Sequence, residues 1–142
     1  MISVMTPDRL DACAELYVEV FRAPPWDETW RLEDARQRLS DFLGAPRSRG
    51  LCLAGPDGVL LGFALGRRER YQDEDHFLLQ EMCVRPDQQG QGHGSALLEA
   101  LTADLADLRH WYLTTMRDGP AAAFYARHGF QPAARQGIFV RP

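Results

Sequence analysis

The 142-residue sequence is poor in three features that would each point to a particular class of protein. Its three cysteines, Cys13, Cys52 and Cys83, lack the paired spacing of a zinc site and the density of a disulfide scaffold, so we expect reduced thiols and a cytoplasmic protein. Lysine and arginine form no dense cluster and the net charge is −4, which argues against capture of nucleic acid. No basic leader and no apolar run near the ~20 residues of a membrane span occurs, so we expect neither secretion nor a membrane partner.

The composition is that of an ordinary globular protein. Hydrophobic residues make up 45% of the chain and charged residues 25%, which is typical of one compact domain. We therefore expect a single domain over residues 1–142.

Two amphipathic helices are predicted near the N-terminus. Thr6 and Pro7 form a helix start, because threonine can cap a free N–H group and proline has none to satisfy. Apolar residues at helical spacing continue to the break at Pro24-Pro25. A second helix, which Thr29 can cap, carries a similar apolar stripe and ends near Gly44.

Extended segments dominate the middle of the chain and alternate with helices towards its end. Pro56-Asp57-Gly58 predicts a hairpin, the polar Asp73–Asp75 interrupts the pattern, and a further helix is expected from Pro120 to His128. This order predicts an α/β fold with a mixed, centrally parallel sheet flanked by helices. The strand candidates are Ile2–Met5, Leu51–Ala54, Val59–Gly66, Phe77–Val84, Trp111–Thr115 and Ile138–Val140.

A glycine-rich turn, Gln88–Gly94, follows one of these strands and opens a helix. A helix N-terminus leaves about four N–H groups unpaired and carries a partial positive charge, so glycines there allow the backbone to wrap a pyrophosphate. The spacing alone also fits a flexible surface turn. It does not fit a dinucleotide fingerprint or a triphosphate loop, because the last glycine interval is wrong and no Gly-Lys-Ser/Thr follows.

The residues around the turn carry a family resemblance. Glu81-Met82-Cys83-Val84-Arg85-Pro86-Asp87, followed by Gln89-x-x-Gly92-x-Gly94, resembles the acetyl-CoA turn of the GNAT superfamily of N-acetyltransferases. Downstream, Ala123–Phe130 is similar to the family's segment in which a Tyr-bearing helix is followed by Gly-Phe. The resemblance is strong from Phe77 to Phe130 and rests on element order before that. It implies a GNAT-like mixed central sheet and an acetyl-CoA-dependent N-acetyltransferase.

Two residues are the catalytic candidates. Transfer of an acyl group to an alkylamine requires a base, because such an amine is mostly protonated at neutral pH. Glu81 lies in an otherwise apolar strand, where burial would raise its pKa towards the working range. The resemblance implies that Tyr125 protonates the departing coenzyme thiolate. Each also has a plain structural alternative, a solvent-facing carboxylate for Glu81 and a packing aromatic for Tyr125.

The coenzyme would be held by backbone groups. The resemblance implies a bulge that splays the Glu81–Val84 strand from the next one, which leaves the N–H of Met82 free for the oxyanion. Gln89 is a neutral amide where arginine is also common, so phosphate binding would rely on N–H groups and on Arg85. The expected acetyl-CoA-binding residues are Met82, Cys83, Val84, Gln89, Gly90, Gln91, Gly92, His93, Gly94 and Ser95.

No metal is expected, because His76, His93, His110 and His128 share no metal-binding spacing. Cys83 is expected to be an inert apolar side chain. A cationic acceptor could be attracted by the Asp73–Asp75 run, or by Asp27 and Glu28 with Trp26 and Trp30.

The expected function is direct transfer of an acetyl group from acetyl-CoA to a primary amine of a small molecule or peptide. Which amine, and whether the chain forms a homodimer, stays open. The alternative is a non-catalytic acyl-CoA-binding sensor or partner subunit.

Overall fold

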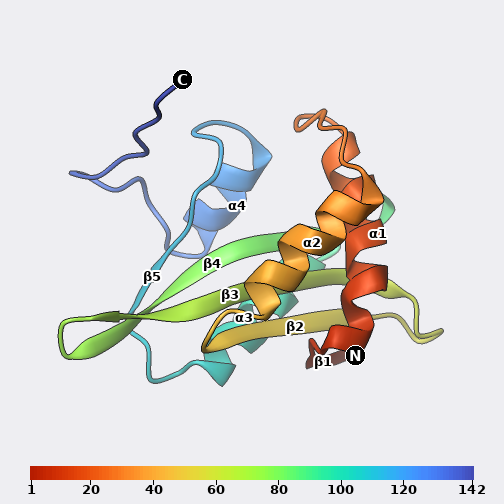
Figure 1. The fold of residues 1–142 in the computed structure, drawn as a ribbon, viewed down its shortest axis with the longest axis horizontal. Coiled ribbons are helices and arrows are strands. Elements are labelled where there is room, and N and C mark those ends of the chain that lie inside the picture. Colours follow the sequence, from red (N-terminus) through yellow and green to blue (C-terminus); the bar gives the residue numbers. More distant parts are fainter.

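The computed structural model describes residues Met1–Pro142 as a five-stranded sheet with helices on both faces (Figure 1). The spatial order of the strands is β1-β2-β3-β4-β5. In sequence the elements are β1 (Ile2–Val4), η1 (Pro7–Arg9), α1 (Leu10–Arg22), α2 (Leu32–Leu43), β2 (Ser48–Ala54), β3 (Leu60–Tyr71), β4 (Glu74–Val84), η2 (Pro86–Gln88), α3 (His93–Asp104), β5 (His110–Tyr112) and α4 (Pro120–Arg127).

The sheet is mixed, as predicted, but its parallel pairing lies at one edge and not at the centre. All neighbouring strands are antiparallel except β4 and β5. The short turns between β2, β3 and β4 force antiparallel pairing, and only the crossover through α3 returns the chain in the same direction. That parallel contact is three residue pairs long, from His76↔His110 to Leu78↔Tyr112.

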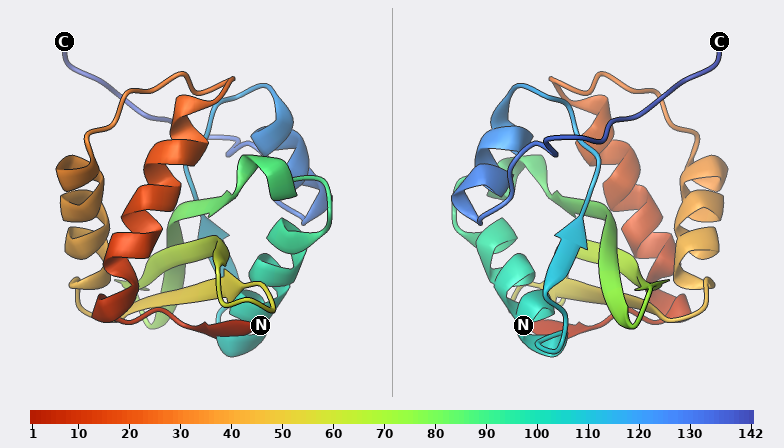
Figure 2. Two further views of the ribbon diagram at one scale, coloured as in Figure 1. Left: turned by 90° about the vertical axis from the view of Figure 1, so that its right-hand side faces the viewer. Right: turned by 90° about the vertical axis from the view of Figure 1, so that its left-hand side faces the viewer.

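Helices α1 and α2 cover one face of the sheet, and α3 and α4 cover the other (Figure 2). The first face buries one core, centred on α1 residues such as Cys13, Ala14 and Tyr17 with Phe63 of β3. The second buries Phe77, Leu97 and Leu101, with side chains of α4 packed against them. The apolar stripes predicted for α1 and α2 therefore face the sheet.

The two predicted caps are absent. Thr6 precedes the short helix η1 and makes no capping hydrogen bond to the backbone. α2 begins at Leu32, because the first N–H groups of the helix, those of Asp34 and Ala35, donate to the carbonyl of Arg31. Thr29 therefore lies outside the helix that it was expected to cap.

Strand β4 contains a bulge that decides which face each of its later residues occupies. Leu65 of β3 pairs with Glu81, whereas the next residue, Gly66, pairs with Leu79, so Gln80 has no partner. Side chains alternate strictly along a regular strand, and one extra residue reverses that alternation. Phe77 and Leu79 accordingly pack with α3, whereas Cys83 packs with α1.

Three other predicted segments differ from the structure. β4 starts at Glu74, so the Asp73–Asp75 run is mostly strand, because β3 and β4 pair as far as Tyr71↔Glu74. β5 is His110–Tyr112, shorter than the predicted Trp111–Thr115. Ile138–Val140 forms no strand, and its side chains are exposed.

None of the helices has the length and apolar character needed to span a bilayer.

The bulge requires a glycine opposite it, and this can be tested with Gly66→Ala. A Cβ atom at position 66 would lie 2.2 Å from the carbonyl oxygen of Leu78 and 2.6 Å from the Phe77 ring. We expect a loss of about 2 kcal/mol or more in the free energy of unfolding, because backbone cannot move aside cheaply. Gly137→Ala, where a Cβ meets no atom within 4 Å, is the control and should change stability by less than ~0.5 kcal/mol. Urea denaturation measures both, and equal stabilities would contradict the expectation.

Candidate active site

The glycine-rich turn at the start of α3 presents an uninterrupted row of free backbone donors. None of the N–H groups of residues 90–95 donates to a protein acceptor. Gly90 and Gly92 have φ of +79° and +86°, a conformation that other residues adopt only with strain. Free N–H groups at a positively polarised helix end form a site for a phosphate-like anion.

The third glycine of the turn has a different role. A Cβ on Gly94 would lie 3.2 Å from the Phe124 ring, so the absence of a side chain lets α4 pack closely on α3. Ser95 Oγ lies 2.9 Å from His128 Nε2 and joins the same two helices. The turn is also tied to the end of β4, because Gln89 Nε2 donates to the carbonyl of Val84 at 3.0 Å. Arg85, expected to assist phosphate, pairs with Asp87 at 3.3 Å.

Beyond the bulge, β4 has an open edge. Arg85 N–H donates to the carbonyl of Leu61, and alternate residues in a strand point their N–H groups to opposite edges. The N–H groups of Met82 and Val84 therefore point away from β3, towards the side where β5 has already ended its pairing. Cys83 differs from these neighbours, because its backbone turns to β3 and its carbonyl lies against Gly62. The expected bulge is present, and it lies immediately before Glu81.

Glu81 lies on the face of the sheet that carries α1 and α2, and its side chain is only 9% exposed. Arg38 Nε donates to its Oε1 at 2.8 Å, and the Tyr17 hydroxyl donates to the same oxygen at 3.2 Å. Burial raises the pKa of Glu81, an effect that Arg38 and Tyr17 partly oppose. Its second oxygen, Oε2, accepts no hydrogen bond from the protein, so one acceptor oxygen of this carboxylate is free.

Aromatic rings pack around Arg38, the ion-pair partner of Glu81. The guanidinium of Arg38 lies 4.7 Å from the centre of the Phe42 ring and 5.8 Å from that of Trp30. Trp30 meets Tyr17 edge-on at 5.2 Å and donates its indole N–H to Glu28. The expected rim residues Glu28 and Trp30 are therefore near this site.

Sequence reasoning missed Tyr17 and Arg38 as site residues. Tyr17 lies on α1 and Arg38 on α2, the two amphipathic helices for which the sequence predicted only packing on the sheet. They precede Glu81 by 64 and 43 residues, so only the packing of the helices on the sheet brings them together.

Tyr125 lies on the opposite face, on α4. Its ring packs between Phe124 and Phe130 at centroid distances of 5.3 and 5.6 Å. Burial, with smaller contributions from the charge of Glu81 and from Cys83, raises the pKa of Tyr125 to about 12. The hydroxyl therefore carries its proton at neutral pH. It makes no hydrogen bond with the protein and is free to donate one.

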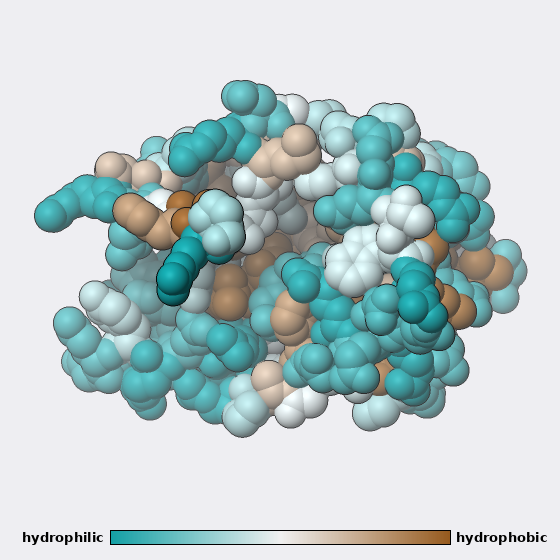
Figure 3. Space-filling view, turned by 45° about the horizontal axis from the view of Figure 1, so that its top comes forward, coloured by the Kyte–Doolittle hydropathy of each residue, from teal (hydrophilic) through white to brown (hydrophobic).

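The surface between α4 and the helix pair α1/α2 is hollowed, with apolar side chains inside the hollow and hydrophilic ones around it (Figure 3). The upper end of β4 lies between these helices (Figure 1). The open edge of β4 thus lies between a carboxylate on one face and a phenol on the other.

Residues 10–130 match the acetyltransferase (GNAT) family. The chain belongs to this family. Its members are acyltransferases that use acetyl-CoA as co-substrate, and the glycine turn, the bulged strand and α4 all lie within the matched range.

Solved structures have the same GNAT fold at low sequence identity. A "probable acetyltransferase" has a TM-score of 0.82 at 19% identity, covering 100% of this chain and 97% of that one. A ribosomal-protein-alanine N-acetyltransferase from Brucella melitensis biovar Abortus 2308 has 0.73 at 16%, covering 99% and 98%. A transcriptional regulator from Bacillus halodurans C-125 has 0.76 at 16%, covering 99% and 98%. A search of curated proteins found no match.

Cys83 does not have the properties of an acyl-accepting nucleophile in this GNAT enzyme. Its side chain is buried against α1, and burial raises the pKa of its thiol well above the ordinary value. A thiol that stays protonated is a poor nucleophile, as expected from the sequence. Cys13 and Cys52 also meet in this core, with their sulfurs 3.8 Å apart.

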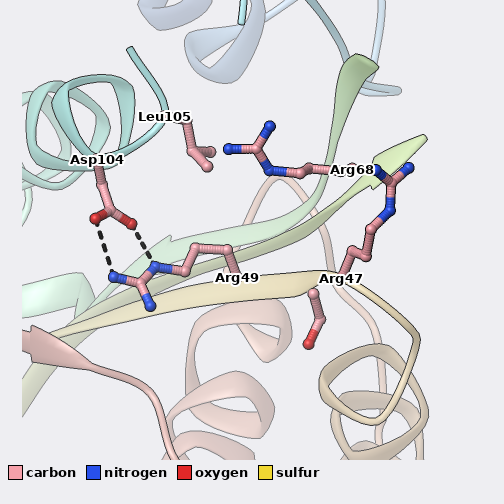
Figure 4. A pocket seen from close by; sticks show the side chains of 6 residues that line it. Arg47, Arg49, Arg68, Asp104 and Leu105 are labelled. Atoms are coloured by element: carbon pink, nitrogen blue, oxygen red, sulfur yellow. Dashed lines mark hydrogen bonds and ion pairs between the residues drawn. The ribbon is translucent and has the colours of Figure 1, made fainter. Parts of the chain in front are cut away.

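A separate pocket lies at the C-terminal end of α3, about 18 Å along the helix from the glycine turn (Figure 4). The sequence shows no dense basic cluster, yet the fold gathers Arg47, Arg49 and Arg68 here. Each is neutralised by a carboxylate: Arg49 pairs with Asp104, Arg68 with Asp107, and Arg47 with Asp75. The pocket therefore offers no unpaired cation to a phosphate.

The ion pair between Arg38 and Glu81 can be tested with Arg38→Leu, through the dependence of stability on pH. Since burial raises the pKa of Glu81, the folded protein holds more protons than the unfolded chain between the two pKa values, and stability falls as pH rises through that interval. Without Arg38 the pKa of Glu81 rises further and the interval widens. We expect an additional loss of about 1–2 kcal/mol between about pH 5 and pH 8, modest because Arg38 is 42% exposed and screened by water.

The matched control is Arg36→Leu, on the same helix, which removes an exposed pair with Asp11. Urea unfolding at both pH values gives the comparison. If stability falls between the two pH values by the same amount in both variants and in the parent protein, Arg38 does not set the pKa of Glu81.

Proposed function

We propose that this GNAT protein transfers an acetyl group from acetyl-CoA directly to a primary amine of a small molecule or peptide. The observation that carries the proposal is the arrangement around the open edge of β4. Free N–H donors of the glycine turn, the free Oε2 of Glu81 and the unbonded hydroxyl of Tyr125 all border it. Phosphate binding, proton acceptance and proton donation are the three tasks of this reaction.

Acetyl-CoA would bind along the face of α3 and α4. The N–H groups of residues 90–95 suit its pyrophosphate, and the open backbone groups of Met82 and Val84 suit the pantetheine and the acetyl carbonyl. Cys83 drops out of the expected set because its backbone and side chain face elsewhere. The acceptor amine would enter from the face of α1 and α2, where Glu81 lies.

The proposed chemistry balances without further reactants. Glu81 accepts a proton from the ammonium group, directly or through one water molecule, and the neutral amine attacks the thioester carbon. Met82 N–H donates to the oxyanion. The attacking nitrogen releases its second proton to solvent, from which Tyr125 is later reprotonated. When the C–S bond breaks, Tyr125 donates its proton to the thiolate, leaving an amide and the free thiol of the coenzyme. This last transfer is uphill, since the pKa of Tyr125 is about 12 and that of a thiol about 8.5, so it requires a close contact between the two groups.

One observation favours the non-catalytic alternative, an acyl-CoA sensor or partner subunit. Arg38 is bonded to Glu81, and an ion pair of this kind can serve stability alone. The enzyme is favoured because a purely structural pair gives no reason for Tyr125 to keep an unbonded hydroxyl on the other side of the same strand.

The deciding experiment is a screen of the purified protein with labelled acetyl-CoA against amines of several classes: aminoglycosides, polyamines, amino acids and peptides. Transfer of label to any amine supports the proposal. Tight binding of acetyl-CoA in calorimetry with no transfer to any class supports the sensor.

The proposed role of Tyr125 as proton donor to the coenzyme thiolate can be tested with Tyr125→Phe. Turnover should fall by about 10²-fold, because the proton donor is lost, whereas the Kd for acetyl-CoA should stay within about threefold, since the ring remains. Tyr112→Phe, on β5, removes a hydroxyl that donates to Glu69 of β3 and should leave both quantities unchanged. Steady-state rates and calorimetry measure them, and undiminished turnover in Tyr125→Phe removes this residue from the mechanism.

For the base we predict the behaviour of Glu81→Gln. The rate at neutral pH should fall by about 10²-fold and recover in part as the pH approaches the amine pKa of about 10.4, where the acceptor loses its proton unaided. Glu33→Gln, on the exposed first turn of α2, is the control. A pH–rate profile that superimposes on that of the parent would show that Glu81 is not the base.

A further inference from the structure

Two histidines that are far apart in the sequence meet at the edge of the sheet. His76 of β4 and His110 of β5 are register partners in the parallel pair, and their rings lie 5.1 Å apart. Glu74 lies two residues before His76 and therefore points to the same side of β4. Its Oε1 is 3.4 Å from His76 Nε2 and 3.9 Å from His110 Nε2.

The three residues have a near-coordinating arrangement. Each offers one ligand atom, a ring nitrogen or a carboxylate oxygen, and these atoms all lie within 4.8 Å of one another. Around a tetrahedral zinc ion with bonds of about 2.0–2.1 Å, neighbouring donors are about 3.3 Å apart. Small rotations of the side chains would close the difference, and His110 is 62% exposed and therefore unhindered.

We propose that Glu74, His76 and His110 form a binding site for a divalent transition-metal ion, with Zn²⁺ as the expected occupant. Two imidazoles and one carboxylate suit zinc and its neighbours in the transition series better than Mg²⁺ or Ca²⁺, which prefer oxygen ligands. Three protein ligands leave a coordination position for water. Two neutral imidazoles and one carboxylate also bring a negative charge to the ion.

The site is separate from the acyl-transfer centre. His76 lies on the same face of β4 as Glu81, five positions away, which is about 16 Å along a strand. Its ligands come from β4 and from β5, which are otherwise held together by only three residue pairs. A bound ion would thus fasten β5 to the sheet. Metal binding here would be independent of acyl transfer.

One neighbouring residue opposes the ion. Arg109 approaches Oε2 of Glu74 at 4.0 Å and is 83% exposed. Its positive charge competes with a metal for the same carboxylate, and it can move into solvent when the metal binds. Removal of Arg109 should therefore strengthen binding, which a merely structural His–Glu contact would not predict.

The test is calorimetric titration of the purified protein, free of any polyhistidine tag, with ZnCl₂. One equivalent should bind and raise the melting temperature. His110→Ala and His76→Ala should each weaken binding by at least ~10-fold and abolish the thermal shift, since direct ligands matter no less than the outer groups that support them. Arg109→Ala should tighten binding. His128→Ala, whose imidazole contacts Ser95 on α3, should bind as the parent does.

His110 is 62% exposed and belongs to neither hydrophobic core, so its removal leaves the packing of the cores intact. Zinc binding that is equally tight in His110→Ala would overturn the proposal, as would the absence of any thermal shift in the parent protein. Replacement by Co²⁺ identifies the donors: nitrogen and oxygen ligands are expected, and a thiolate-to-cobalt absorption band would assign the metal to the cysteines instead.

Discussion

The extra residue in β4 is the constraint on which the rest of the site depends. Gln80 has no partner in β3, and this reverses the alternation of every side chain that follows. Without it, Glu81 would follow Phe77 and Leu79 into the core beneath α3. With it, the carboxylate meets Tyr17 and Arg38 on the other face, while Met82 and Val84 turn towards α3 and α4. One bulge thus divides the two halves of the proposed reaction between the two faces of the sheet.

The anion site depends on backbone and not on charged side chains. The protein has a net charge of −4, and the three arginines that line the pocket at the end of α3 are already paired with carboxylates. Arg85, the basic residue beside the turn, also has a carboxylate partner. The free N–H groups at the start of α3 therefore supply the local positive potential, at a position fixed by Gln89 and by the contact of Gly94 with Phe124.

The environment of Glu81 combines opposing effects in a way that suits a base. Burial raises its pKa, while Arg38 and Tyr17 limit the increase through a single oxygen. The other oxygen stays available. Burial raises the pKa of Tyr125, which therefore keeps its proton. The negative charge of Glu81, on the opposite face, raises that pKa further. The family match establishes acyl transfer as the general activity. The side chains that select the acceptor are expected among the aromatic residues around Arg38.

Local patterns in the sequence determined a large part of this protein: the two amphipathic helices, the α/β class, the glycine turn, and the placement of Glu81 and Tyr125 on either side of it. They could do so because periodicity, turn chemistry and helix-end donors depend on residues near one another in the chain. Tertiary structure alone decided that β4 bulges at Gln80, that Ile138–Val140 pairs with no strand, and that Tyr17 and Arg38 reach Glu81. It also brought together His76 and His110, which lie far apart in the sequence and follow no metal-binding spacing. The physical reason is that strand register and helix packing bring together residues from different elements. The residue types within one strand indicate neither of them.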